Sequence, residues 1–358
     1  MSAMPEYTLE ALGWNEWFAS QSARCGEQHG AARVAAVDRD QLLLVGTPGV
    51  FRGKLPGKAL HASADPSQRP CVGDWVCVEQ SAQDQFGVVH AVLDRQTCLR
   101  RKAPGDPVQY QMIAANVDYV IIVQSCHYDF NLKRLERYLV MVKDGGAIPV
   151  ILLTKVDLMA ADALASQIDE IRSAGITEPV LTLSNVTHEG VDALKSHLAP
   201  GKTYCFVGSS GVGKSTIINA LLGRDALETQ DVSGSGEGRH TTVRRELVVL
   251  ASGAMVVDNP GMREFGILGA EGGIEASFPE IFELASQCRF RDCTHTNEPG
   301  CAVLEAVEDG RISADHFESF VQLTKESAYY DASYAERRKK DRERGRYFKS
   351  VLKDLAEE

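Results

Sequence analysis

The chain has 358 residues, of which 44% are hydrophobic and 24% are charged, a balance typical of a globular protein with two or three domains rather than an extensively disordered one. The net charge of −11 argues on its own against nucleic acid as a partner, although a net charge averages over domains and can hide a basic face. No apolar run approaches the roughly 18 residues of a membrane helix, and the first ten residues do not resemble a secretory signal. Nine cysteines without regular spacing favour reduced thiols and one metal site over a disulfide scaffold, so we expect a cytoplasmic protein without membrane contact.

Two N-terminal segments precede the main domain. Residues 1–30 form an extension with Trp14, Trp17 and Phe18, for which the sequence predicts no particular structure. In residues 31–105, about five short apolar runs alternate with turn residues, which favours a small β-barrel of the OB type, a fold that often binds oligonucleotides. These apolar runs include 34–37, 42–45, 75–78 and 88–93. Ten Lys or Arg against seven Asp or Glu make this segment basic, and Arg100-Arg101-Lys102 is expected to close it; a barrel used for protein contacts or as a spacer is the alternative.

From about residue 113, apolar strands alternate with amphipathic helices, which predicts a parallel sheet covered by helices on both faces. We expect strands at 119–123, 150–153, 180–183, 203–207, 246–250 and 255–257. We expect helices with apolar faces at 132–142, 164–171, 191–198 and 214–222. The remainder, 275–358, is predicted to be mostly helical.

Residues 208–216 match the phosphate-loop pattern G-x-x-x-x-G-K-S/T in full, between a predicted strand and a predicted helix. Glycines let the backbone wrap a phosphate, and the loop N–H groups at the helix N-terminus favour the anion. We expect Lys214 to reach the β and γ phosphates and the Ser215 hydroxyl to ligate Mg²⁺. The expected nucleotide-binding residues of this loop are Gly208, Ser209, Ser210, Gly211, Val212, Gly213, Lys214, Ser215 and Thr216. The pattern alone leaves open ATP or GTP, and hydrolysis or phosphotransfer.

The tetrapeptide Thr154-Lys155-Val156-Asp157 ends a predicted strand and is similar to the N/T-K-x-D guanine motif of GTPases. A carboxylate at Asp157 can accept from both N1–H and the 2-amino group of guanine, and adenine offers no such pair of donors. Thr154 stands where Asn is usual, and its shorter side chain is expected to weaken the tether to the phosphate loop. The alternative for the tetrapeptide is a helix N-cap. The strand ending at 181–185 is expected to supply a further loop beside the base.

Two further segments after the phosphate loop are similar to GTPase switches. In Gly238-Arg-His-Thr-Thr, Thr242, or Thr241 if the register differs by one, is expected to ligate Mg²⁺ and sense the γ-phosphate. In Asp258-Asn-Pro-Gly261, Asp258 is expected to support Mg²⁺ and the Gly261 N–H to contact the γ-phosphate. Because the guanine motif precedes the phosphate loop here, the order of motifs predicts a circularly permuted GTPase domain.

The catalytic group is predicted from what the second switch lacks. Met262 and Arg263 follow Gly261 where many GTPases place a glutamine that orients the attacking water, so intrinsic hydrolysis should be slow. His240 lies next to the switch threonines, and an imidazole can orient water or accept its proton. We therefore expect His240 to be catalytic, the alternatives being a histidine that contacts RNA or packs the switch.

Two features of the C-terminal region suggest a metal and a nucleic acid. Three cysteines and one histidine lie within fourteen residues, which is the ligand set of a closed, structural tetrahedral zinc site rather than a catalytic one. These expected ligands are Cys288, Cys293, His295 and Cys301. Residues 336–349 hold eight Lys or Arg against three acidic residues, with Tyr347 and Phe348 among them, and such a segment suggests contact with a phosphate backbone. A chance cluster of buried thiols is the alternative for the metal site, and a solvated helix face is the alternative for the basic segment.

In this order, the guanine motif, phosphate loop, switches and Cys-x4-Cys-x-His-x5-Cys pattern, together with Pro70-Cys-Val-Gly-Asp-Trp-Val and Ala114-Ala-Asn-Val-Asp, resemble the RsgA (YjeQ/YloQ) family of small ribosomal subunit biogenesis GTPases. The resemblance implies a GTPase that hydrolyses GTP in late maturation of the small (30S) ribosomal subunit, is stimulated by that subunit, contacts its rRNA and acts as a monomer. The expected parts are the extension 1–30, an OB domain 31–105, a permuted GTPase domain 110–270 and a zinc domain 275–358 with a basic C-terminal helix. An RNA-binding OB and zinc module with GTP as a passive ligand, and a phosphate-loop kinase or ATPase, remain alternatives.

Overall fold

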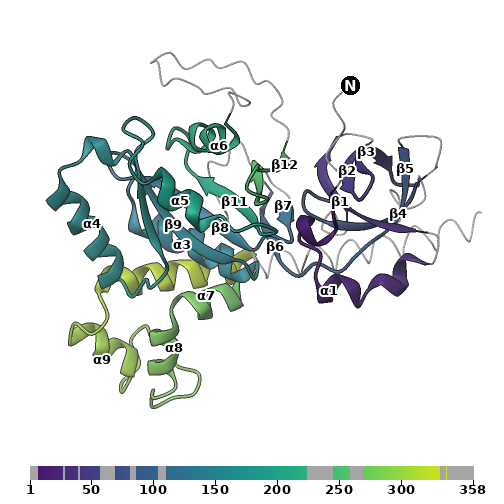
Figure 1. The fold of residues 1–358 in the computed structure, drawn as a ribbon. Helices are drawn as coiled ribbons and strands as arrows, with labels where there is room; N and C mark the ends of the chain where they lie inside the picture. Colours follow the sequence, from purple (N-terminus) through teal and green to yellow (C-terminus); the bar gives the residue numbers. More distant parts are fainter. Residues whose placement is uncertain are drawn as a thin grey trace, which may run out of the picture.

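The computed structural model describes residues 7–26, 29–38, 41–56, 69–80, 86–103, 110–223, 245–258, 269–330 and 336 (Figure 1). The strands are β1 (Gly30–Val37), β2 (Leu42–Gly46), β3 (Gly49–Lys54), β4 (Trp75–Gln80), β5 (Phe86–Val92), β6 (Cys98–Lys102), β7 (Tyr110–Ala115), β8 (Tyr119–Ser125), β9 (Ile148–Thr154), β10 (Val180–Leu183), β11 (Thr203–Gly208), β12 (Glu246–Val249) and β13 (Met255–Asp258). The helices are η1 (Glu10–Leu12), α1 (Glu16–Ala19), η2 (Ser22–Cys25), α3 (Leu132–Asp144), η4 (Val156–Leu158), α4 (Ala161–Ser173), α5 (Val191–His197), α6 (Lys214–Leu222), α7 (Glu271–Ser277), α8 (Pro279–Ala285) and α9 (Ala302–Glu308), and residues 314–330 are also helical. Within the described ranges, no helix combines the length and apolarity that crossing a membrane requires.

The first five strands form the predicted barrel. They are ordered β1-β2-β3-β5-β4, and a further pairing of β1 with β4 closes the circle. Side chains alternate along a strand, so Val76 and Val78 of β4 join the barrel interior while Trp75 and Cys77 join the core on the outer side. Arg100-Arg101-Lys102, at the end of the basic segment expected to form the barrel, lie outside it in β6, which pairs with β7 in a separate two-stranded sheet.

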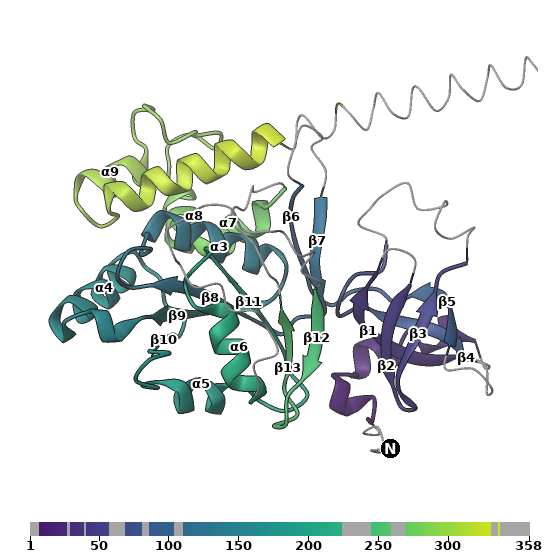
Figure 2. The same ribbon diagram turned by 90° about the horizontal axis from the view of Figure 1, so that it is seen from above.

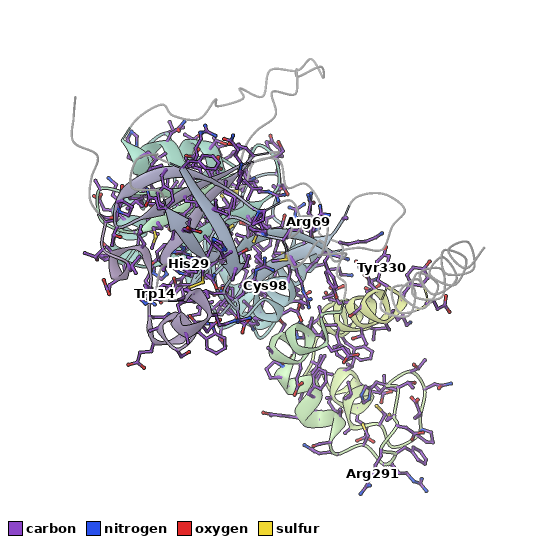
Figure 3. All side chains as sticks on the ribbon, turned by 90° about the vertical axis from the view of Figure 1, so that its right-hand side faces the viewer. Trp14, His29, Arg69, Cys98, Arg291 and Tyr330 are labelled. Atoms are coloured by element: carbon purple, nitrogen blue, oxygen red, sulfur yellow. A yellow bond between two sulfur atoms is a disulfide. The ribbon has the colours of Figure 1, made fainter. Side chains whose placement is uncertain are left out.

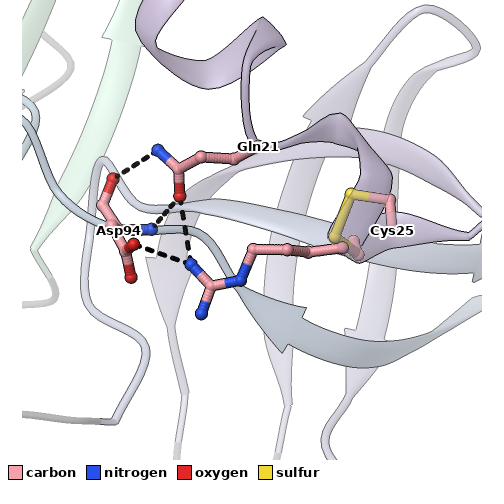
Figure 4. Close-up of a disulfide and its surroundings, with 5 residues drawn as sticks. Gln21, Cys25 and Asp94 are labelled. Atoms are coloured by element: carbon pink, nitrogen blue, oxygen red, sulfur yellow. Dashed lines mark hydrogen bonds and ion pairs between the residues drawn. A yellow bond between two sulfur atoms is a disulfide. The ribbon is translucent and has the colours of Figure 1, made fainter.

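The N-terminal extension packs on the outer side of the barrel. The ring centroids of Trp14 and Phe18 lie 4.8 and 5.8 Å from that of Trp75 on β4. A disulfide joins Cys25 to Cys77, with the two Cα atoms 4.9 Å apart (Figure 4). The expectation of reduced cysteines is therefore wrong for this pair, whereas the other seven cysteines are free. The extension and the barrel thus form one packed unit (Figure 3).

The central sheet has the order β10-β9-β8-β11-β13-β12. Its first five strands are parallel, and one core packs α3 and α4 against one face while a second core packs α5 and α6 against the other. Figure 2 shows α3 and α6 on opposite sides of the sheet. The sheet is not parallel throughout, because β12 runs antiparallel to β13: the turn between them is too short for a crossover.

The barrel and the central sheet are joined through β1. Ala36 of β1 pairs with Glu246 of β12, which makes one continuous sheet. Next to this junction the buried Arg33 donates to the carbonyl oxygens of Leu12, Gly73 and Asn116 at 2.5, 3.2 and 2.7 Å. Burial lowers the pKa of Arg33 to about 10, against the opposing effects of nearby carboxylates. One side chain therefore links the extension, the barrel and the segment that leads into β8.

The C-terminal helices form their own core against α3. Buried side chains of α7, α8, α9 and the 314–330 helix cluster together, and Val140 of α3 belongs to the same cluster. The 314–330 helix lies beside α3 (Figure 2), where Arg137 forms a 2.7 Å ion pair with Glu326. The predicted helical character of this region is confirmed for its described part.

Candidate nucleotide site and metal cluster

The phosphate loop lies between β11 and α6, as the pattern predicts. Gly208 ends β11 with φ of 145°, and a Cβ there would stand 2.1 Å from the carbonyl oxygen of Val123 on β8. Gly213 precedes α6 with φ of 98°, and a Cβ there would stand 2.6 Å from Nδ2 of Asn185. Only glycine fits both positions, so the loop backbone can approach the neighbouring strand and the loop after β10.

Lys214 is a half-buried cation at the start of α6. Its ammonium donates to the carbonyl oxygen of Gly208 at 2.8 Å. Burial lowers the pKa of Lys214 to about 8, while the charges of Asp129 and Asp258 oppose this shift. Two carboxylates, one at the end of β13 and one in the loop after β8, therefore act on the same ammonium. An anion bound at the helix N-terminus would favour the protonated form of Lys214.

The residues of the guanine motif lie beside this loop. Thr154, fully buried at the end of β9, donates its hydroxyl to the carbonyl oxygen of Val212 at 2.7 Å. The threonine hydroxyl itself therefore ties β9 to the phosphate loop. Lys155 adopts a left-handed conformation with φ of 61°, and η4, which contains Asp157, begins directly after it.

The loop after β10 fixes the carboxylate of the guanine motif. The Ser184 hydroxyl donates to Oδ1 of Asp157 at 2.5 Å. The same hydroxyl accepts from the amides of Val186 and Thr187, both at 3.1 Å. Asp157 is thus oriented by a serine that is itself held by backbone amides, and its second oxygen lies outside this pairing.

Parallel topology explains why these segments meet. The carboxyl ends of β8, β9, β10, β11 and β13 share one edge of the sheet, where ligands of open α/β sheets bind. Two contacts there were not predicted from the sequence: Tyr138 of α3 hydrogen-bonds Ser209, and Asp129 acts on Lys214. Asp129 could have been found, because it follows β8 at the same edge; the Tyr138 contact depends on how α3 packs.

Several expected site residues lie outside the described residues. These are Thr241, Thr242, His240 and Gly261. The basic residues 337–349 also lie outside them. Asp258 is described and is 8% exposed at the end of β13. The site therefore brings together the phosphate loop, the guanine motif and Asp258.

The four expected metal ligands converge at one point between α8 and α9. Their ligand atoms all lie within 4.8 Å of one another. Cys288 Sγ is 3.8 Å from Cys301 Sγ and 3.7 Å from Nδ1 of His295, which is 3.3 Å from Cys301 Sγ. A tetrahedron with Zn–S bonds of about 2.3 Å has S···S edges of about 3.8 Å. The amide of Leu304 donates to Cys301 Sγ, as in sulfur-ligated sites. These residues fit one tetrahedral zinc ion.

A family model, relatives of similar sequence and solved structures all match the chain to the same family. The family model described as RsgA GTPase matches residues 92–268. The small ribosomal subunit biogenesis GTPase RsgA 2 of Lactiplantibacillus plantarum is 43% identical over 83% of this chain and 83% of the relative. The RsgA 2 protein of Vibrio vulnificus is 38% identical over 99% of this chain and 98% of the relative. Among solved structures, YjeQ from Thermotoga maritima covers 82% of this chain and 97% of its own, with a TM-score of 0.62 and 26% identity. With the permuted order of strands around one nucleotide edge, these matches establish that the chain belongs to the RsgA family of GTPases.

Proposed function

We propose that this chain hydrolyses GTP to GDP and phosphate as a factor in the biogenesis of the small ribosomal subunit. The single observation that carries the proposal is the carboxylate of Asp157, which Ser184 holds by a hydrogen bond. Asp157 lies just after β9, the strand that Thr154 ties to the phosphate loop. A fixed carboxylate at this edge is the partner that guanine's two donors require. The names of the relatives in Lactiplantibacillus plantarum and Vibrio vulnificus support the link to the small subunit.

The phosphate end of the nucleotide would lie over Lys214 and the N-terminus of α6. The phosphates would add negative charge beside the half-buried ammonium, on which Asp129 and Asp258 already act. Mg²⁺ would be held by Ser215, supported by Asp258 and by Thr242, or Thr241 in the alternative register. The ion neutralises phosphate charge when bound. Lys214 would add a positive charge beside the phosphates, and Asp258 would add a negative charge beside the ion.

His240 is our candidate for the group that orients the attacking water. Its position beside the switch threonines and the absence of a glutamine after Gly261 support this role. In such an arrangement the imidazole accepts a hydrogen bond or a proton from water, and the γ-phosphate contact of Gly261 completes the site.

The C-terminal region would hold one structural zinc ion through Cys288, Cys293, His295 and Cys301. The barrel and the basic residues 337–349 would contact ribosomal RNA. Because 314–330 packs on α3, and α3 contacts the phosphate loop through Tyr138, nucleotide and RNA contacts would act on one connected framework. The protein would act as a cytoplasmic monomer.

The hypothesis that Asp157 recognises guanine is tested by measuring the affinities of wild type, Asp157→Asn and the control Asp162→Asn for GTP and ATP. Asp162 is an exposed acid at the start of α4, so its replacement removes the same charge outside the site. We expect Asp157→Asn to lose at least about tenfold of the preference for GTP and the control to keep it. Equal preference in wild type and Asp157→Asn would refute guanine recognition by this residue.

A further inference from the structure

A second cluster of side chains of the types that ligate metals lies on the barrel, far in sequence from the C-terminal cysteines. His29 comes from the end of the N-terminal extension, Glu79 from β4 and His90 from β5. Their ligand atoms all lie within 4.8 Å of one another. Nε2 of His90 is 2.9 Å from Oε2 of Glu79, and Nε2 of His29 is 3.9 Å from the same oxygen.

The backbone around the cluster is fixed by pairing on both sides. Gly30, next to His29, pairs with Val78 on β4, and Glu79 pairs with Val88 on β5. The disulfide between Cys25 and Cys77 attaches the extension to β4 two residues before Glu79. The three ligand positions are therefore brought together before any ion binds, which lowers the conformational cost of binding.

A second set of contacts holds the same segment of the extension. Arg24 forms a 2.7 Å ion pair with Asp94, and the amide of Asp94 donates to the side chain of Gln21 at 2.7 Å (Figure 4). The extension thus reaches His29 from a segment anchored to the barrel by a covalent bond and by polar contacts.

We propose that His29, Glu79 and His90 form a metal site of this protein that binds a divalent ion of the zinc type. Two imidazoles and one carboxylate are the donor set of three-ligand zinc sites, in which water completes the coordination. Ligand-to-ligand edges of such a site are about 3.4 Å, between the two distances measured to Glu79.

The two imidazole rings must turn to coordinate one ion. They are stacked with centroids 4.1 Å apart and planes 11° apart, so the lone pairs of their nitrogens lie in two nearly parallel planes. The side chains of His29 and His90 are 24% and 37% exposed, which leaves room for rotation about χ1 and χ2. Binding would replace the contact of His90 with Glu79 by two metal bonds and would fasten the extension to the barrel.

The experiment is equilibrium dialysis of the full chain, stripped of metal and with its thiols outside the disulfide reduced, against zinc chloride. We expect two equivalents of zinc in wild type, one at the four-ligand cluster and one here. His90→Ala and Glu79→Gln should each bind one equivalent, and His127→Ala should bind two, because His127 is an exposed histidine outside both clusters. Glu79→Gln keeps the size of an exposed side chain, so it reports on the carboxylate and not on folding.

Cobalt(II) supplies a readout that separates the two sites. Cobalt bound by three sulfurs gives thiolate-to-metal charge-transfer absorption, whereas cobalt bound by His29, Glu79 and His90 gives ligand-field bands alone. We expect the second equivalent of cobalt to add only ligand-field bands in wild type and none in His90→Ala. Uptake of a single equivalent by wild type, or of two by both His90→Ala and Glu79→Gln, would overturn the proposal.

Discussion

Replacing His316 should loosen the C-terminal helices from the GTPase domain. His316 lies in the 314–330 helix, and its two ring nitrogens are each 2.6 Å from a carboxylate oxygen, one of Glu136 on α3 and one of Glu280 on α8. The side chains of His316 and Glu136 are 6% and 3% exposed, while that of Glu280 is 39% exposed. A protonated imidazole between two carboxylates therefore joins three helices at one buried point.

The free energy by which His316 stabilises this contact follows from its pKa. Burial acts to lower this pKa, but the hydrogen bonds and charges of Glu136 and Glu280 outweigh it and raise the pKa from 6.5 to about 9. At 1.36 kcal/mol per pKa unit, the upper bound is about 3 kcal/mol, and solvent access at Glu280 reduces the expected value to about 2 kcal/mol. Because the folded pKa is raised, this stabilisation is complete below the unfolded pKa of about 6.5 and is lost as the pH rises through about 9.

The assay is hydrogen exchange of residues 271–330, corrected for intrinsic exchange, at about pH 6.5 and about pH 9.5. Wild type should lose about 2 kcal/mol of protection between the two pH values, and His316→Ala should be less protected at the lower pH and lose little more on going to the higher one. Lys133→Ala, which removes an exposed ion pair of α3 with Glu318, is the control and should behave as wild type does. Equal protection of wild type at both pH values would refute the role of a charged His316.

Three further outcomes are expected. Thr154→Val should weaken GTP binding by about 5- to 30-fold, because the carbonyl oxygen of Val212 loses its donor, and Thr154→Ser should restore most of the loss; unchanged GTP affinity in Thr154→Val would show that the tether is dispensable. Cys293→Ala should lose the zinc of the four-ligand cluster by elemental analysis and loosen 271–330 while leaving GTP binding near wild type. Reversing the charges of residues 337–340 should weaken binding to small ribosomal subunits and flatten its dependence on salt, whereas an unaltered slope would exclude these residues from the contact.

The central sheet could be predicted closely because its signals are local. The strand at 180–183 and the helix at 214–222 begin and end where the apolar pattern and the phosphate-loop pattern place them. The alternation of short apolar runs with turn residues in 31–105 likewise predicted the barrel. The antiparallel β12 was missed because a run of apolar residues carries no information about strand direction.

Long-range packing explains what the sequence could not predict. The extension had no readable pattern, yet Trp14 and Phe18 pack on Trp75, and Cys25 bonds to Cys77, from partners more than fifty residues away. The partner of the Thr154 hydroxyl, the carbonyl oxygen of Val212, likewise could not be predicted. The Thr154 hydroxyl reaches the phosphate loop because β9 and β11 flank β8, a spacing that only the folded sheet defines.

GTP turnover with and without purified small ribosomal subunits distinguishes a GTPase of small-subunit biogenesis from a passive GTP-binding module. We predict slow release of phosphate by the protein alone and a strong rise with the subunit, and His240→Ala should remove most of that rise, by on the order of 100-fold, while GTP and subunit binding persist. A stimulation that persists in His240→Ala would move the catalytic group elsewhere, most directly to the ribosomal RNA. Subunit binding without any rise in GTP turnover by the wild-type protein would instead show a passive GTP-binding module.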